Sequence, residues 1–152
     1  MRALYVSLCA VAAIVLLAGP VQATTGGQSC HKINAKGIGQ DLGGGSTTAQ
    51  IMGGGFLHGT TAGTFAIVGG APPAFAIAGT VVFTTNAGTL TVGVSGTFDV
   101  STGAFSATGP VTSSTGKLEG ATGSLTLEGV QDLGTGAFTE TVTGSICVDL
   151  FP

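Results

Sequence analysis

The segment "TLTVGVSGTFDV" (residues 89–100) alternates between apolar and polar side chains with a period of two residues. Its even positions carry the apolar set, which is Leu90, Val92, Val94, Phe98 and Val100. A period of two indicates a β-strand with one buried face and one face in water, as is common in antiparallel sheets. We therefore expect an antiparallel sheet whose core receives the even-numbered side of this segment.

The same alternation occurs in "TVTGSICVDL" (residues 141–150) and in "AFAIAGTVVFT" (residues 74–84), and we find no helical periodicity after residue 23. Glycine-bearing turns at residues 86–88, 101–103 and 134–136 have lengths that suit β-hairpins. The sequence predicts an all-β domain of hairpin-connected strands. Its predicted inward-facing residues are Phe75, Ile77, Val81, Phe83, Leu90, Val92, Val94, Phe98, Leu125, Leu127, Val142 and Ile146.

The first 23 residues have the features of a secretory signal peptide. A basic Met1-Arg2 precedes an apolar run over residues 3–17, and small residues follow at Val21 and Ala23. We expect cleavage after Ala23, a single domain over residues 24–152, and a secreted or periplasmic location. An uncleaved N-terminal anchor is the alternative.

Two cysteines follow the signal peptide, Cys30 and Cys147, and in an exported chain such a pair is read as a disulfide. Two buried free thiols are the alternative. Along its strand, each cysteine falls in the same alternating set of positions as the polar residues, so both are expected on outward faces. If the first and last strands are adjacent, about eight strands close into a barrel without an open edge. An open two-sheet sandwich is the second choice.

The composition after residue 23 excludes several partners. That part of the chain has no Arg, Tyr or Trp, and its seven acidic residues outnumber its lysines, Lys32, Lys36 and Lys117. Binding to nucleic acid or to an anionic membrane surface requires clustered basic residues. An outer-membrane barrel would require aromatic girdles and an apolar outer face. We expect neither nucleic-acid binding nor membrane association after signal cleavage.

A partial repeat links "GTFDVSTGAF" (residues 96–105) with "GVQDLGTGAF" (residues 129–138), and "GTF" also occurs at Gly63. We interpret it as a recurring pair of hairpin strands, because three imperfect copies are few for a propeller or solenoid. Asp99 and Asp132 recur just before the turns, where Asp commonly bonds its own backbone. Paired-carboxylate catalysis is the alternative role for these two residues.

The segment "TGKLEGATGSLTL" (residues 115–127) resembles a motif of the barrel superfamily of plant allene oxide cyclases and dirigent proteins, and of small bacterial secreted proteins presumed to share that barrel. The resemblance implies an eight-stranded antiparallel barrel with an apolar cavity, and a trimer. It also implies structural roles for Thr115, Gly116, Gly120, Ala121 and Gly123. Plant dirigent proteins use charged pocket residues that include Arg, which this chain lacks after residue 23, so no catalytic residue is transferred.

Other candidate chemistry is sparse. Cys30, His31 and His58 lack a fourth metal ligand at a recognisable spacing, so no metal site is predicted. "GIGQDLGGGSTT" (residues 37–48) lacks the Gly-Lys-Ser/Thr of a phosphate-binding loop, and we interpret it as a loop after the first strand. No cofactor is expected. His58, Glu128 and Glu140 are the acid–base groups considered for an inward position.

Three functions follow from these features. The first is an exported barrel that binds or shelters a small apolar molecule, since eight strands enclose just enough space for one. The second is a structural or cell-surface protein that assembles through its Thr-rich strands. The third is a cyclase or isomerase like the plant proteins, for which the acid–base residues are few.

Overall fold

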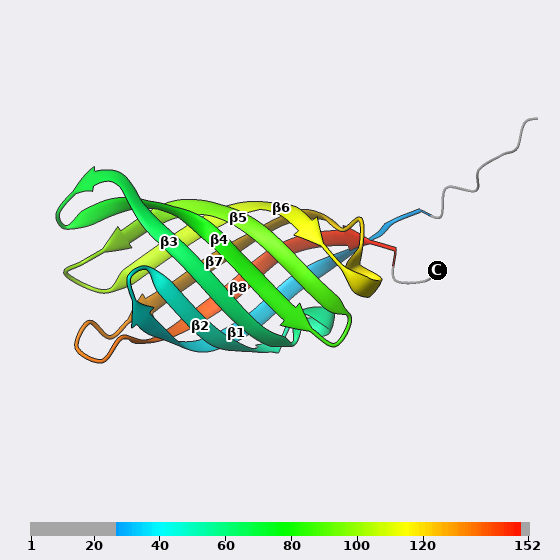
Figure 1. Cartoon of the computed structure of the whole chain (residues 1–152), viewed down its shortest axis with the longest axis horizontal. Helices are drawn as coiled ribbons and strands as arrows, with labels where there is room; N and C mark the ends of the chain where they lie inside the picture. The colour runs from blue at the N-terminus through cyan, green and yellow to red at the C-terminus, as the bar shows by residue number, and fades with distance from the viewer. Residues whose placement is uncertain (1–26, 150–152) are drawn as a thin grey trace, which may run out of the picture.

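The protein is a closed antiparallel β-barrel of eight strands (Figure 1). The structure, a computed structural model, describes residues 27–149; the predicted signal peptide lies outside this range. The strands are β1 (Ser29–Gly43), β2 (Ser46–Gly53), β3 (Gly59–Ala71), β4 (Ala74–Thr85), β5 (Gly88–Asp99), β6 (Ala104–Ser114), β7 (Thr122–Gln131) and β8 (Ala137–Val148). Two 3₁₀ turns, η1 (Gly55–Leu57) and η2 (Gly116–Leu118), interrupt the connections. No helix within residues 27–149 is long and apolar enough to cross a membrane.

Each strand pairs with the next one in the sequence, and β1 pairs with β8 to close the ring. The predicted closed barrel is therefore confirmed over the sandwich. One copy of the repeat contains the turn between β5 and β6, and the other contains the turn between β7 and β8. The two copies are therefore the tips of two hairpins of the same barrel.

The alternation seen in the sequence places one face of every strand inside the barrel. In β5 the inward residues Leu90, Val92 and Val94 are buried, as the period of two predicted. Val100, predicted on the same face, is 39% exposed because β5 ends at Asp99 and the chain turns there. The period therefore describes the strand correctly up to its last residue.

The barrel end that carries the termini is closed by side chains. Leu57 of η1 and Leu118 of η2 are fully buried, and Ala121 is buried beside the second turn. Lys117 and Glu119 lie exposed around Leu118. The 3₁₀ turns thus direct one leucine each into the barrel while their charged neighbours stay in water.

The motif residues 115–123 form the connection that carries η2. Gly116, Gly120 and Gly123 have φ values of 65°, 76° and 124°, a region that favours glycine. The Thr115 hydroxyl accepts a hydrogen bond from the backbone N–H of Thr89 at 3.1 Å, which ties this connection to the start of β5. These contacts fit a structural role for the motif.

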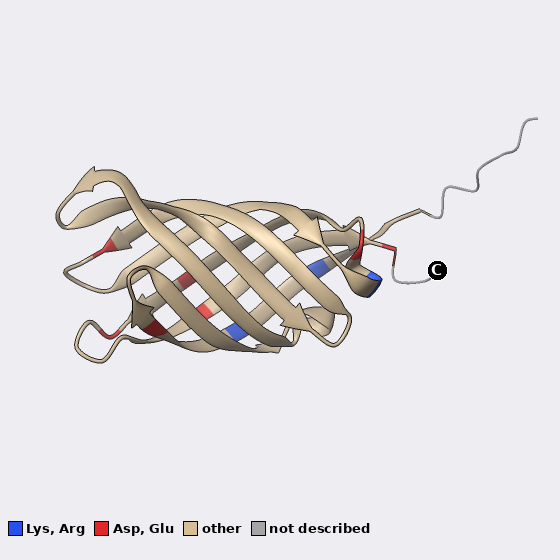
Figure 2. Ribbon diagram, in the orientation of Figure 1, with Lys and Arg blue, Asp and Glu red and all other residues tan. Residues whose placement is uncertain are grey.

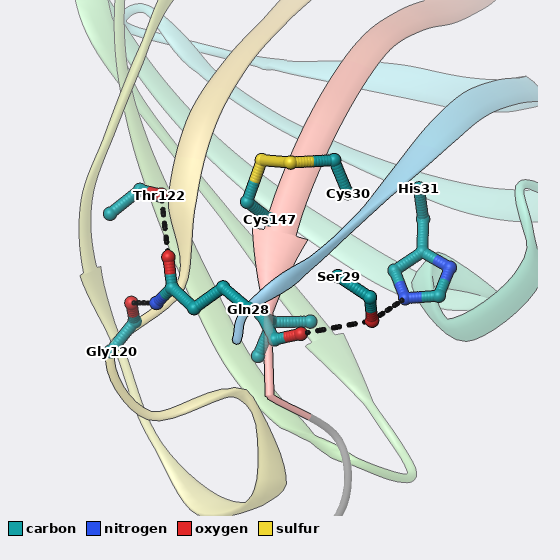
Figure 3. Close-up of a disulfide and its surroundings, with 8 residues drawn as sticks. Gln28, Ser29, Cys30, His31, Gly120, Thr122 and Cys147 are labelled. Carbon is teal, nitrogen blue, oxygen red and sulfur yellow. Dashed lines mark hydrogen bonds between the residues drawn. A yellow bond between two sulfur atoms is a disulfide. The ribbon is translucent and has the colours of Figure 1, made fainter. Parts of the chain in front are cut away.

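Cys30 and Cys147 form a disulfide on the outer face of the barrel, at directly paired positions of β1 and β8 (Figure 3). Beside it the Gln28 side chain donates a hydrogen bond of 2.8 Å to the carbonyl of Gly120. The bond joins the start and the end of the barrel without entering the core. A disulfide fits an oxidising compartment.

The interpretation of residues 37–48 as a loop was wrong. β1 continues to Gly43 and β2 begins at Ser46, so only a tight turn separates the two strands. Glycine hides the alternation of this segment, because Gly37 and Gly39 face inward without a side chain to mark that face. Their inward positions are occupied instead by side chains from β8.

A pocket in the open half of the barrel

The half of the barrel away from the termini has glycine at many inward positions. A Cβ atom at Gly79 would lie 2.8 Å from the Phe65 ring, and one at Gly129 would lie 2.5 Å from the Phe105 ring. A Cβ atom at Gly39 would likewise meet the Phe138 ring. In the other half, Phe83 and aliphatic side chains such as Leu90 and Leu125 fill the interior. Glycines opposite phenylalanines therefore make the open half a space bordered by aromatic rings.

This half contains a cavity of about 280 Å³. Its lining is mostly apolar and comes from all eight strands, and its larger apolar side chains include Phe65, Val81, Phe98, Phe105, Leu127 and Phe138. The volume is close to the lower end of the range of about 300–1,000 Å³ found for small-molecule sites. A small apolar molecule matches the size and chemistry of this space.

Phe105 and Phe138 occupy matched positions of the sequence repeat and meet inside the pocket. Their ring centroids are 5.8 Å apart and the rings are nearly perpendicular, an edge-to-face arrangement that aromatic pairs favour. The two copies of "TGAF" in the repeat therefore bring two phenylalanine rings into contact within the pocket.

Glu140 is the one charged residue that is buried within residues 27–149. It lies on β8 in the inward set with Val142 and Ile146, it lines the cavity, and only 7% of its surface is exposed. Removal of the carboxylate from water raises the pKa of Glu140 from 4.5 to about 7. Near neutral pH this side chain exists in both protonated and ionised forms.

Two polar side chains, those of Asp41 and Gln131, lie where the pocket opens to the outside. The Gln131 side-chain amide donates a hydrogen bond of 3.0 Å to Asp41, and the backbone N–H of Gly43 donates one of 2.8 Å to the other carboxylate oxygen. Asp41 and Gln131 line the cavity, as does the hydroxyl-bearing Thr47 near the start of β2, whereas Thr61 lines it deeper in the barrel, where it is buried. The opening is therefore polar and acidic, whereas the walls are apolar.

The residues predicted from sequence to face inward divide into three groups. Ile77, Val81, Phe98 and Leu127 line the pocket. The fully or largely buried residues Phe83, Leu90, Val92, Val94, Leu125, Val142 and Ile146 belong to the packed core and do not line it. Phe75 is half-buried, lies near the β3–β4 turn and does not line it either.

The other acid–base candidates lie elsewhere. Glu128 is exposed and accepts a hydrogen bond of 3.4 Å from Ser106, and His58 is exposed. His31 packs edge-on against Phe56 near the closed end, at a centroid distance of 5.6 Å. Of the three residues considered for an inward position, the structure directs only Glu140 into the barrel. Its parity with Val142 was the available sequence signal.

Asp99 and Asp132 act in the turns. The Asp99 carboxylate accepts hydrogen bonds from Ser101 and Thr102, with the Ser101 hydroxyl contributing most to a lowered pKa of Asp99. The Asp132 carboxylate accepts bonds from the backbone N–H groups of Thr135 and Gly134, which likewise lower its pKa. The predicted backbone-bonding role of both residues is confirmed.

Fold and site together define a barrel with one end closed by side chains and an apolar pocket at the other. Comparisons with protein-family models, with curated proteins and with solved structures give no significant match to this chain. The likeness of residues 115–127 to the allene oxide cyclase and dirigent superfamily stays a prediction.

Proposed function

We propose that this protein is an exported binding protein that holds a small apolar molecule in the open half of its barrel. The observation that carries the proposal is the cavity of about 280 Å³, whose walls are mainly phenylalanine and aliphatic side chains. Burial of apolar ligand surface there supplies roughly 25 cal/mol per Å² before the costs of association are subtracted. Export is supported by the signal-peptide features of residues 1–23 and by the disulfide.

The geometry supports binding better than catalysis. Among the residues that the structure describes, Glu140 is the one titratable side chain buried in the pocket, and Asp41 at the opening accepts hydrogen bonds from Gln131 and from the Gly43 backbone. General acid–base catalysis on a bound molecule commonly needs groups that both donate and accept protons at one reacting centre. The cyclase or isomerase hypothesis therefore ranks below binding.

The test is a screen of the oxidised protein, residues 24–152, against short-chain alcohols, phenols and terpenoid alcohols. Thermal unfolding and native mass spectrometry are the measurements. We expect one-to-one complexes and a midpoint that rises with ligand concentration, because a ligand that binds only the folded state stabilises it. A barrel that gives no complex and no shift with any compound would contradict the proposal.

Assembly is the second candidate function, and one surface feature favours it. Ile38 on β1 and Val130 on β7 are 57% and 55% exposed, and both pair with Thr139 of β8, so the two lie in one row on the outer face. Leu133 in the adjacent turn is 50% exposed. Light scattering of the oxidised protein tests this candidate, and a strict monomer at high concentration counts against it.

A further inference from the structure

Glu140 combines burial with the lack of a partner. Only 7% of its surface is exposed, and within residues 27–149 no side chain or backbone group forms a hydrogen bond or ion pair with its carboxylate. No fully buried side-chain oxygen or nitrogen in this range lacks a partner, so the carboxylate oxygens border the open space of the pocket. Buried charged groups are normally paired, because an unpaired one loses its hydration without compensation. A carboxylate that faces a cavity without a partner is therefore a place where a ligand would supply one.

The barrel makes specific room for this side chain. Gly37 of β1 pairs directly with Glu140 of β8. A Cβ atom at position 37 would lie 2.6 Å from Glu140 Cγ and 2.7 Å from Oε1, closer than real Cβ contacts allow. The absence of a side chain at Gly37 is what lets the carboxyl group occupy its position against the barrel wall. The site is thus formed by two strands.

The polar side chains that line the pocket with Glu140 are either acidic or uncharged. β1 contributes Asp41 to the pocket, and β7 contributes the neutral Gln131. Among the described residues that line the pocket, none is Lys, Arg or His. Lys32 and Lys36 of β1 and Glu128 of β7 lie on the outward, exposed faces of their strands. Nothing within the lining neutralises the Glu140 carboxylate.

The same polarity extends to the outside of the barrel. Asp99 and Asp132 lie at the turns of the open end, whereas Lys117 and Glu119 lie together at the closed end. Figure 2 shows acidic but no basic segments at the turns of the open end. Acidic groups around an opening raise the local concentration of cations and lower that of anions. Both the interior and the approach to the pocket therefore favour a positively charged group over a carboxylate.

Resting on the proposed function, we propose that Glu140 selects ligands that carry a basic amine. The apolar part of the molecule fills the phenylalanine-lined cavity, and its ammonium group donates a charge-assisted hydrogen bond to the Glu140 carboxylate. Such a ligand supplies the missing partner and keeps Glu140 ionised. A neutral alcohol leaves the charge uncompensated, and a carboxylate adds a second negative charge to the first.

The experiment compares three probes with one hydrocarbon chain: octylamine, 1-octanol and octanoate. Binding to the oxidised protein is measured by titration calorimetry at pH 8. We expect octylamine to bind roughly ten- to a hundredfold more tightly than 1-octanol, in keeping with a hydrogen bond between charged groups. Octanoate is expected to bind most weakly. Equal affinities for octylamine and 1-octanol would overturn the selectivity.

Two variants assign the preference to Glu140. Glu140→Gln keeps the shape of the side chain and is expected to abolish the advantage of octylamine while 1-octanol binds as before. Glu128→Gln removes a carboxylate from the outer face of the neighbouring strand and is expected to change neither. An amine preference that survives in Glu140→Gln would contradict the proposal. Circular dichroism verifies that each variant is folded.

The pH dependence gives an independent readout. Octylamine affinity is expected to fall as the pH drops below about 7, by up to tenfold per pH unit, because the amine must then displace a proton from Glu140. Asp41 is retained in Glu140→Gln, so a slope that disappears in this variant belongs to Glu140.

The outcomes distinguish this inference from the function on which it rests. If 1-octanol binds and octylamine binds no better, the amine preference fails and apolar binding stands. If none of the three probes binds at concentrations up to their solubility, the binding function fails and the amine preference fails with it.

Discussion

Glu140 and Gly37 face each other across the seam where β8 pairs with β1, and the space above the glycine holds the glutamate side chain. The pairing of β8 with β1 closes the barrel and also places the Glu140 carboxyl group in the apolar pocket. Burial without an internal partner makes this group costly to ionise. The consequences for stability, packing and binding can each be measured.

The first prediction concerns stability against pH. Burial in the folded protein raises the pKa of Glu140 from 4.5, its value in the unfolded chain, to about 7. Between these pH values the folded state holds more protons, so the free energy of unfolding falls as the pH rises and levels off above pH 7. The loss amounts to about 3 kcal/mol over the whole window.

Urea denaturation of the wild type and of Glu140→Gln at several pH values between 4 and 8 measures this effect. We expect the difference in stability between the two proteins to shift in favour of Glu140→Gln as the pH rises. Other titrating groups are common to both proteins and cancel in the difference. Parallel stability profiles would show that Glu140 is not desolvated in solution.

The second prediction tests the contact between the two facing residues. Gly37→Ala should destabilise the barrel, because its Cβ would meet the Glu140 side chain. In a Glu140→Ala background that obstacle is gone, so the same substitution should cost less by about 0.5–3 kcal/mol. The four proteins form a double-mutant cycle measured by urea denaturation. An additive result would mean that the two side-chain positions do not interact.

The third prediction tests the cavity itself. Ala107→Leu places a larger apolar side chain into the pocket, where Ala107 is part of the lining. Binding of 1-octanol should weaken by roughly tenfold or more, since about three buried CH₂ groups of the ligand lose their space. The stability of the barrel should stay the same or rise, because the new side chain fills an existing void.

Ala104→Leu is the matched control for this cavity variant. Ala104 lies on the same strand, β6, but is exposed on its outer face. The control should bind 1-octanol as the wild type does. If both variants bind equally well, the ligand occupies some place other than the cavity.

The fourth prediction concerns the disulfide. Cys30 and Cys147 are 117 positions apart in the sequence, so the bond constrains nearly the whole described chain in the unfolded state. Its reduction should lower the free energy of unfolding by roughly 4–5 kcal/mol in the chain-entropy model. Urea denaturation with and without a reductant measures the loss.

The double variant Cys30→Ser, Cys147→Ser should match the reduced wild type and be insensitive to the reductant. Peptide mapping under non-reducing conditions should recover the two cysteine peptides joined. Recovery of two free thiols from the folded protein would contradict the bond, and the stability argument would then fail.

Much of the fold could be predicted from local sequence patterns. The alternation in residues 89–99 and 141–148 assigned strands and inward faces correctly, because each pattern depends only on the pleat of its own strand. The parity of Cys30 and Cys147 placed both on outer faces, and the disulfide confirms that the terminal strands are neighbours.

Glycine-rich segments were harder to predict. Residues 37–48 resemble a loop when taken alone, yet Gly37 and Gly39 belong to β1 because Glu140 and Phe138 of β8 fill the space beside them. The side chains that pack beside these two glycines come from β8, about a hundred positions further along the chain. No local pattern contains this information.

By itself the sequence determined the strands whose alternation is not interrupted by glycine, and the apolar face of each of them; through its two cysteines it also predicted that the two ends of the domain meet. Only the tertiary structure decided that one half of the interior is packed and the other hollow, and that Glu140 borders the hollow. The physical reason is that the free volume of a barrel depends on the combined size of inward side chains from all eight strands, whereas periodicity describes one strand at a time.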